Sequence, residues 1–190
     1  MPVAARMRKR VPPAESVSIL TKAAPPCGSG WLRAFLVATV LTACASGLVV
    51  QELQGRVVRV ADGDTVTVLD QAKVQHRIRL AGIDAPERGQ PCGERAKDHL
   101  SSVVAGRQVV VAWDKRDRYG RMVGKVLLDG RDVNLAMVQA GLAWHYKAYA
   151  LEQSEEDRLT YSRAEDSARR SRTGLWVDPH PMAPWDWRRR

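Results

Sequence analysis

The sequence is poor in the residues that bind soft metal ions or form disulfide frameworks. Its 190 residues include three cysteines and four histidines, and neither type occurs at metal-site spacing. Cys27, Cys44 and Cys92 stand singly, so a zinc-type cysteine cluster is excluded. A signal cleaved after Ala45 would leave only Cys92, and no internal disulfide could then form. No histidine is paired with Cys92, which is expected to pack near a helix start rather than act as a nucleophile.

Closely spaced carboxylates are what the sequence has instead. Asp62 and Asp64 lie in an Asp-Gly-Asp-Thr turn, and Asp84 and Glu87 in an Ile-Asp-Ala-Pro-Glu turn that follows Arg79. Carboxylates at this spacing repel one another unless a cation neutralises them. Oxygen ligands without histidine or cysteine favour calcium or magnesium over zinc. An arginine beside such a cation suits a phosphate.

Each fragment taken singly is also typical of an ordinary turn. An EF-hand is excluded, because positions six and twelve counted from Asp62 are Thr67 and Lys73, where glycine and glutamate are required. A third motif, Asp-Arg-Tyr-Gly-Arg at residues 117–121, changes the interpretation. These three motifs in this order resemble the thermonuclease family, the staphylococcal nuclease-like proteins. The resemblance covers residues 55–176.

The resemblance implies a site for one calcium ion. The residues that match the family's ligands are Asp64, Asp84 and the backbone carbonyl of Ala85. The family's best-known member has threonine at the position of Ala85, and alanine should serve because the ligand is a main-chain oxygen. Asp62 matches an acidic residue that acts on the ion through water.

The resemblance also implies the groups that act on the phosphodiester. Glu87 matches the carboxylate assigned as general base for the attacking water, and it either abstracts the proton or orients the water. Arg79 and Arg121 match the two guanidinium groups that grip the phosphate and stabilise the transition state. Arg118 and Tyr119 match positions that contact a neighbouring phosphate.

Two parts of the chain depart from the family pattern. The loop at residues 88–93 is short where the best-known member has a longer, lysine-rich loop. The tyrosines that stack on bases do not align cleanly, and the residues in that region are all candidates for the stacking wall or for the core: Trp144, His145, Tyr146 and Tyr149. His76, on a predicted strand, is expected to be a surface or core residue.

Five segments have the pattern of short strands separated by turns: residues 55–61, 65–69, 75–80, 108–113 and 122–128. Five short strands suit a small closed barrel, and the resemblance implies an OB-fold. The predicted fold is one mainly β, α+β domain, a five-stranded OB-fold barrel with three packed helices.

The three helices are predicted from apolar periodicity and caps at residues 94–104, from the Asp132 cap to Ala140, and from the Ser154 cap to near Gly174. The inward positions are expected to be Ala96, Leu100, Val103 and Val104 in the first, Val133, Ala136, Met137 and Ala140 in the second, and Tyr161, Ala164 and Ala168 in the third.

Residues 1–45 resemble an export segment. They carry six basic residues and one acidic residue, and an apolar run precedes a small-x-small cleavage pattern ending at Ala45. Three alternatives stay open: a cleaved signal, a lipobox that would make Cys44 a lipidated N-terminus, and an uncleaved anchor over residues 34–50. Each predicts a periplasmic, secreted or membrane-attached domain after a short linker at 46–54.

The net charge is +9 for the whole chain and +4 for residues 46–190, which hold 24 basic and 20 acidic residues. A mildly basic body is in keeping with a polyanionic partner. The tail at residues 177–190 carries Trp185 and Trp187 before three arginines. The tryptophans are expected to dock the tail on the barrel. Residues 188–190 are interpreted as a solvated end, with a nucleic-acid contact as the alternative.

The predicted function is a calcium-dependent endonuclease that hydrolyses DNA or RNA without preference for the sugar. The resemblance implies products that end in a 3′-phosphate. Single-stranded or flexible nucleic acid is the expected partner, and the chain is expected to be a monomer. The alternatives are a non-catalytic OB-fold module that binds nucleic acid and a domain recruited to exopolysaccharide biosynthesis. The enzyme is favoured because Arg79, Glu87, Arg121 and the two ligand aspartates are all present.

Overall fold

The computed structural model describes residues 50–190. The predicted export segment at residues 1–45, with its three alternatives, lies outside the described residues, as do residues 46–49 of the predicted linker. Among the described residues, no helix has the length and apolar character needed to cross a membrane.

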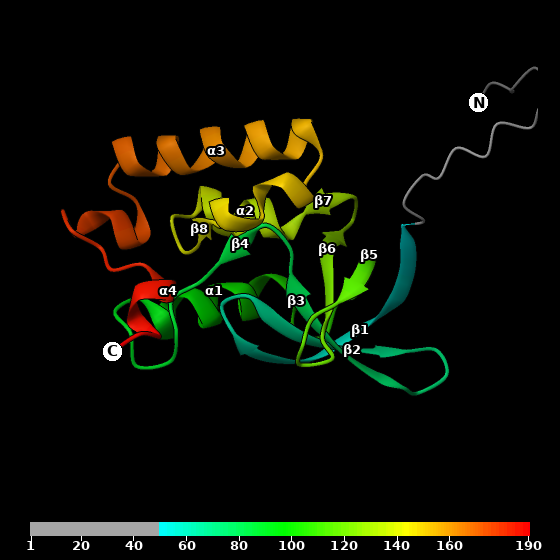
Figure 1. Ribbon diagram of the computed structural model, residues 1–190. Helices are drawn as coiled ribbons and strands as arrows, with labels where there is room; N and C mark the ends of the chain where they lie inside the picture. Colours follow the sequence, from blue (N-terminus) through cyan, green and yellow to red (C-terminus); the bar gives the residue numbers. More distant parts are fainter. Residues whose placement is uncertain (1–49) are drawn as a thin grey trace, which may run out of the picture. The chain divides into compact units, whose positions relative to one another are not determined.

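A closed barrel forms the body of the molecule, made of β1 (Gln51–Asp62), β2 (Thr65–Asp70), β3 (Gln75–Leu80), β5 (Gln108–Arg116) and β6 (Met122–Leu128) (Figure 1). The strands pair in the order β3-β2-β1-β5-β6, and β3 also pairs in parallel with β6, which closes the sheet. The five-stranded OB-fold barrel predicted from the sequence is therefore confirmed. A short strand, β7 (Arg131–Asp132), pairs with the end of β6.

The first strand begins earlier than the sequence pattern predicted. Residues 51–54, expected in a linker, pair with β5 in register from Gln51 opposite Trp113 to Gln54 opposite Val110. Leu53 packs against the barrel core from this extension. The ladder hydrogen bonds and this apolar contact together favour strand over linker.

Side chains that alternate along the strands fill the barrel. Val57, Val66, Val68, Ile78 and Val111 are all almost completely buried. This period-two burial is what a closed sheet with one inner face requires. The core that they begin continues into the helices, so the barrel and helices form one packed unit.

Three helices pack with the barrel: α1 (Gly93–Val104), α2 (Val133–Gln139) and α3 (Glu155–Arg170) (Figure 1). The predicted caps are confirmed, because the Asp132 side chain accepts a hydrogen bond from Leu135 N at 3.0 Å and the Ser154 hydroxyl accepts one from Asp157 N at 3.1 Å. The inward faces predicted for α1 and α3 are also confirmed, although Val103 is only partly buried.

The face predicted for α2 is partly wrong. Asn134 and Val138 are fully buried, whereas Ala136 and Ala140 are only partly buried. The Asn134 side chain accepts from Val126 N at 3.1 Å and donates to the carbonyls of Gly124 at 3.1 Å and Ala81 at 3.0 Å. These bonds to the barrel hold α2 in its rotation, because a buried amide must be hydrogen-bonded.

A second apolar cluster holds the C-terminal part of the chain. It consists of Trp144, Ala168, Leu175, Trp176 and Ala183, with Trp185 packed against it. The short elements around this cluster were not predicted: β4 (Ile83–Asp84), which pairs with β8 (Trp144–His145), the 3₁₀ helices η1 (Lys147–Glu152) and η2 (Gly174–Val177), and α4 (Pro184–Trp187).

Candidate active site

A cleft of about 710 Å³ opens beside the β3–β4 segment, the β5–β6 hairpin and the C-terminal tail. It contains every site residue predicted from the sequence: Asp62, Asp64, Arg79, Asp84, Ala85, Glu87, Arg118, Tyr119 and Arg121. The three motifs, which lie up to 59 positions apart in the chain, thus meet in one place.

The two acidic turns meet because the β1–β2 turn has no side chain at Gly63. A Cβ at this position would come within 2.7 Å of the Cβ atoms of Ala85 and Ala96, which is closer than real side chains approach. Asp64 then locks the turns together. Its Oδ2 accepts a hydrogen bond from Ala85 N at 2.8 Å, and its carbonyl accepts one from Leu80 N at 2.8 Å.

Arg79 bridges the two carboxylates at the floor of the cleft. Its Nη1 lies 2.9 Å from Asp64 Oδ2, and its Nη2 lies 2.7 Å from Asp84 Oδ1. The Asp64 side chain is 9% exposed, that of Asp84 1% and that of Arg79 13%. One guanidinium therefore holds two buried carboxylates in place, a charge-assisted arrangement that is strong where water is excluded.

The floor carries more negative charge than Arg79 neutralises. Burial, together with the charge of Asp64, raises the pKa of Asp62 to about 6. Burial also raises the pKa of Asp84, although the neighbouring arginines oppose the shift. Both shifts show that a full set of ionised carboxylates is costly here without further positive charge.

The donor set fits a hard cation bound by oxygen. Asp64 and Asp84 supply carboxylate oxygens, and the backbone of Ala85, next to Asp84, is hydrogen-bonded to Asp64. No sulfur or imidazole of the described residues lines the cleft. Within residues 50–190, no three acidic, histidine or cysteine side chains converge closely enough to bind a metal ion by themselves. A cation at this site would therefore depend on the two aspartates, main-chain oxygen and water.

Residues 188–190 are exposed, as interpreted from the sequence, but the Arg188 side chain also binds two carboxylates of the cleft. Its Nη2 lies 2.8 Å from Asp84 Oδ2 and its Nη1 lies 2.6 Å from Glu87 Oε1. The hydrogen bonds with Asp84 raise the pKa of the Arg188 guanidinium. No local pattern indicates this contact, because it joins residues about a hundred positions apart.

Asp117 orders the hairpin that carries the third motif. Its Oδ1 accepts from the backbone N–H groups of Tyr119 at 2.9 Å and Arg121 at 3.0 Å, and its Oδ2 accepts from Arg121 Nε at 2.7 Å. Against the opposing effect of burial, these bonds from Arg121 and Tyr119 lower the pKa of Asp117. Sequence reasoning assigned no role to Asp117, although an aspartate that opens a turn ending in glycine is a known signal for such bonds.

Arg121 also reaches the floor of the cleft. Its Nη1 donates to Thr65 Oγ1 at 3.3 Å, and this hydroxyl donates to Asp64 Oδ1 at 3.1 Å. Arg118 and Tyr119 lie on the exposed rim, with the Arg118 guanidinium 4.9 Å from the centroid of the Tyr119 ring. Tyr119 is 64% exposed, so its ring is available to a ligand.

The aromatic candidates fall into two groups. Trp144 and His145 are buried, at 5% and 2% exposure, and belong to the core. Tyr146 and Tyr149 line the cleft, and their rings meet edge to face with centroids 4.9 Å apart. Trp185 stacks on Tyr146 at 5.4 Å with the ring planes 1° apart. Trp185 of the tail thus supports Tyr146, which lines the cleft beside Tyr149.

The short loop after Glu87 is tied to the tail. The Gln90 side chain accepts a hydrogen bond from Glu87 N at 2.9 Å and donates to the Met182 carbonyl at 2.7 Å. A Cβ at Gly93 would lie 2.1 Å from the Glu87 carbonyl oxygen, so only glycine lets α1 start here. Cys92 stands directly before α1 with a φ of 67° and packs against the second apolar cluster, so the prediction that it packs near a helix start is confirmed.

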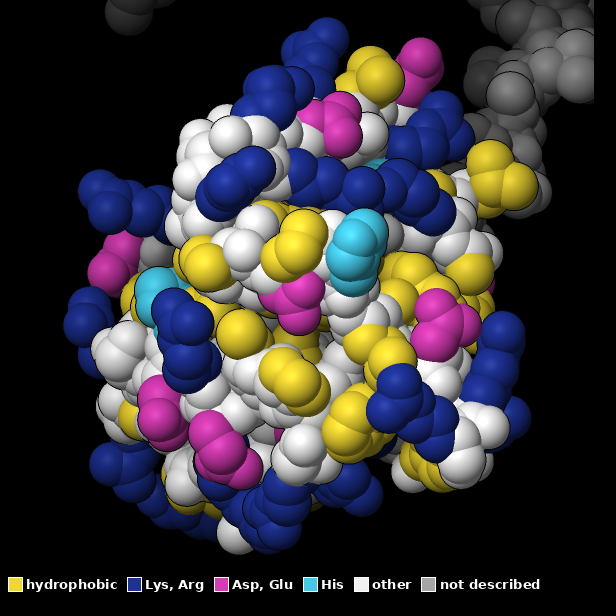
Figure 2. Space-filling model, turned by 90° about the vertical axis from the view of Figure 1, so that its left-hand side faces the viewer, with side chains coloured by type: hydrophobic (Ala, Val, Ile, Leu, Met, Phe, Trp, Pro, Cys, Tyr) yellow, Lys and Arg dark blue, Asp and Glu magenta, His cyan; other side chains and the backbone are white. Residues whose placement is uncertain are grey.

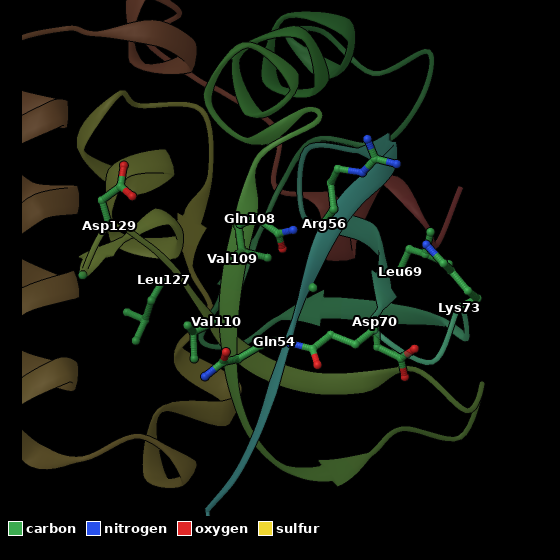
Figure 3. A pocket seen from close by; sticks show the side chains of 13 residues that line it. Gln54, Arg56, Leu69, Asp70, Lys73, Gln108, Val109, Val110, Leu127 and Asp129 are labelled. Carbon is green, nitrogen blue, oxygen red and sulfur yellow. The ribbon is translucent and has the colours of Figure 1, made fainter.

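A second hollow, of about 790 Å³, is bordered by β1, β2 and β5 and contains none of the predicted site residues. The side chains labelled in Figure 3 come from several strands and turns and are spread around the hollow rather than gathered at one point. On the face shown in Figure 2, Lys and Arg side chains are likewise distributed over the surface, with Asp and Glu side chains between them. The convergent chemistry is therefore in the first cleft.

The comparisons with known proteins agree with this geometry. A family model described as "Staphylococcal nuclease homologue" matches residues 77–178, which is more than half of the chain. This chain belongs to the staphylococcal nuclease homologues. The resemblance inferred from the three motifs is confirmed. The matched span includes Arg79, the Asp84 turn and the Asp117–Arg121 hairpin of this homologue.

Bacterial relatives of this staphylococcal nuclease homologue are similar over most of their length. An uncharacterized endonuclease of Escherichia coli O157:H7 is 46% identical over 140 residues, which cover 73% of this chain and 87% of the relative. Protein ParB of Escherichia coli is 45% identical, with 73% and 80% covered. A micrococcal nuclease of Shigella flexneri is 40% identical over 167 residues, with 83% and 92% covered.

Proposed function

We propose that this staphylococcal nuclease homologue is a calcium-dependent endonuclease that hydrolyses phosphodiester bonds of DNA or RNA in the cleft. The observation that carries the proposal is the convergence of the Asp64–Arg79–Asp84 floor with Glu87 and Arg121 in one cleft. Sugar-nonspecific cleavage and 3′-phosphate products belong to the proposal as implications of the family resemblance.

The enzyme class is the better-supported part of this function. The chain matches the nuclease family model, and relatives with 40–46% identity are named endonuclease or micrococcal nuclease. The prediction of a nuclease that acts as a hydrolase is therefore confirmed at that level. The metal, the nucleic acid and the roles of single residues are proposals.

Asp64, Asp84 and the Ala85 carbonyl would hold the calcium ion, with Asp62 acting on it through water. Bound there, the ion would draw electron density from a phosphate oxygen and offset its charge. Arg79 keeps the two aspartates at a fixed separation, because its two terminal nitrogens bind one carboxylate each. Preorganised ligands of this kind reduce the reorganisation needed when an ion binds.

Glu87 and Arg121 are placed to act on the substrate from the mouth of the cleft. The Glu87 side chain is 37% exposed, so its carboxylate can reach a water molecule and take or direct its proton. Arg121 is oriented by Asp117 and Thr65. Its planar guanidinium suits the oxygens of a phosphate, whose negative charge grows in the transition state.

Digestion of DNA and RNA with calcium and with a calcium chelator tests the proposal. We expect cleavage of both nucleic acids in calcium and none in chelator, with magnesium a poorer activator because it demands stricter octahedral geometry. End-group analysis of the products should find 3′-phosphates. Full cleavage in chelator, or recovery with zinc alone, would contradict the oxygen-ligand site. Binding without cleavage under every condition would favour the non-catalytic OB-fold module.

A further inference from the structure

The C-terminal tail is anchored beside the cleft by contacts before and within α4. Before the helix, the Met182 carbonyl accepts the hydrogen bond from Gln90, and Ala183 is buried in the second apolar cluster. Within the helix, Trp185 packs on Trp144 at 6.2 Å between ring centroids and stacks on Tyr146. The backbone that bears Arg188 is therefore held in place, and the Arg188 side chain extends from it into the site.

The Arg188 side chain binds the groups on which the proposed chemistry depends. Its Nη2 lies 2.8 Å from Asp84 Oδ2, and its Nη1 lies 2.6 Å from Glu87 Oε1 and 3.3 Å from Asp84 Oδ1. Arg79 already binds Asp84 Oδ1 at 2.7 Å. Both oxygens of Asp84 thus accept hydrogen bonds from guanidinium groups, and the Glu87 carboxylate is engaged as well.

We propose that Arg188 is a built-in competitor of the activating cation, so that the C-terminal tail holds the site in an inhibited state until the cation displaces this side chain. The proposal rests on the proposed function, because it takes Asp84 as a cation ligand and Glu87 as the base. The competition takes place at Asp84 and Glu87, the carboxylates that Arg188 binds. The tail would therefore have a role that the three nuclease motifs do not include.

Charge and geometry favour competition over a role for Arg188 in binding phosphate. Both terminal nitrogens of the Arg188 guanidinium already donate to Asp84 or Glu87, so a phosphate could bind them only by breaking these bonds. A guanidinium and a calcium ion both neutralise the same carboxylates, so each lowers the affinity of the site for the other. Displacement is feasible because the Arg188 side chain is 41% exposed and can rotate into solvent while α4 stays packed.

Calcium titration by calorimetry, without nucleic acid, measures the competition directly. If the side chain occupies the carboxylates about nine-tenths of the time, Arg188→Ala should bind calcium roughly tenfold more tightly than the unchanged protein. Arg188→Lys should lie between them, because a lysine cannot bridge Asp84 and Glu87 with a planar fork. The matched control is Arg189→Ala, which removes the same charge from the neighbouring position. Within residues 50–190 the Arg189 side chain pairs with exposed Asp186 alone, at 3.6 Å.

Thermal unfolding in chelator gives a second readout that does not depend on activity. Arg188→Ala should melt at a lower temperature than Arg189→Ala, because buried Asp84 loses one of its two countercharges. Excess calcium should remove the difference by replacing that charge. Persistence of the full difference in excess calcium would contradict competition and would make Arg188 a structural residue.

The outcomes separate this proposal from the proposed function. Equal or weaker calcium binding by Arg188→Ala, relative to Arg189→Ala, would overturn the competitor role, whereas calcium-dependent cleavage by the unchanged protein would leave the nuclease proposal intact. Calcium binding that appears only after Arg188→Ala would support competition in its strongest form. If neither protein binds calcium, the cation site fails and the competitor role fails with it.

Discussion

The two arginines predicted to grip the phosphate lie in opposite surroundings. Arg79 is enclosed at the floor, where both terminal nitrogens are bound to the buried carboxylates of Asp64 and Asp84. Arg121 lies on the hairpin, where its Nε binds Asp117 and its Nη1 binds Thr65. Its Nη2 has no hydrogen-bond partner among the described residues. The floor arginine therefore builds the site with both terminal nitrogens, whereas the rim arginine keeps one terminal nitrogen for a ligand.

This difference assigns different roles to the two arginines. A guanidinium with two buried carboxylate partners contributes to stability as well as to the positions of the ligands, because leaving buried charges unpaired is costly. A guanidinium held by Asp117 of its own hairpin and by the Thr65 hydroxyl, with no buried carboxylate partner, contributes mainly in the transition state, where phosphate charge develops. The same substitution at the two positions should therefore have different effects.

Changing Arg79 and Arg121 separately to lysine should produce the largest effects. Each change keeps the charge and removes the planar fork, and we expect kcat to fall by at least about a hundredfold, roughly 3 kcal/mol. Only Arg79→Lys should also lower the free energy of unfolding, by about 2–3 kcal/mol, since a buried carboxylate loses its partner. Kinetics beside denaturant unfolding tests this.

Two results would remove the distinction between floor and rim. If Arg121→Lys destabilised the protein as much as Arg79→Lys, the hairpin arginine would be equally structural. If both variants cut nucleic acid at the original rate, neither guanidinium would act on the phosphate.

Glu87→Gln should lower kcat by about a hundredfold without affecting stability, because the amide keeps the shape but takes no proton. Among the described residues, the Glu87 side chain pairs with Arg188 at the exposed mouth, and the contact with Gln90 is through the Glu87 backbone N–H. Single-turnover rates with circular dichroism measure the two effects. The matched control is Glu152→Gln, which changes another carboxylate of the same cleft that pairs with Lys115. A comparable loss in the control would indicate a general charge effect.

Much of the framework could be predicted because its signals are local. Asp132 and Ser154 cap the helices expected from their spacing, and the strand pattern led to the barrel. The acidic turns were placed together from the family order of the motifs, and Gly63 provides the physical reason that they can touch. This part of the fold is predictable because it depends on hydrogen bonds between neighbouring residues and on the sizes of single residues.

The remainder depends on contacts between distant residues. Asn134 turns α2 by bonding to β6 and to Ala81, and its identity in a helix pattern gave no sign of that partner. Arg188 was interpreted as solvated because a terminal run of arginines is usually exposed. Its pairing with Asp84 follows only from the packing of Trp185 and the position of α4.

Asp117→Asn should lower kcat by about tenfold, because an amide nitrogen cannot accept the hydrogen bond from Arg121 Nε that orients the rim arginine. The pKa of Asp117 is lower in the folded state than its unfolded value of 3.8, so ionised Asp117 stabilises the fold above pH 3.8. This contribution is lost as the pH falls through the pKa of the folded state. Solvent screening should keep the contribution under about 1 kcal/mol.

Melting curves of Asp117→Asn from pH 2 to pH 7 provide the check. The variant should be less stable than the original protein at neutral pH, and the gap should close below about pH 4. A gap that widens toward acid pH would show that the Asp117 contacts do not depend on its charge.

Arg118→Ala should have the smallest effect, because Arg118 lies on the exposed rim with its guanidinium over the Tyr119 ring rather than on the floor. We expect KM to rise about threefold, kcat to change little, and the slope of log affinity against log salt to decrease by about one, as one phosphate contact is lost. Oligonucleotide binding at several salt concentrations measures that slope. Arg131→Ala is the control, since it removes an exposed charge on β7 outside the cleft and should leave the slope unchanged.

An equal decrease in both variants would mean that nucleic acid binding depends only on the net charge of the surface. A hundredfold loss of kcat in Arg118→Ala would place the transition-state contacts on the rim at Arg118 as well as at Arg121, and the division between floor and rim would then have to be redrawn.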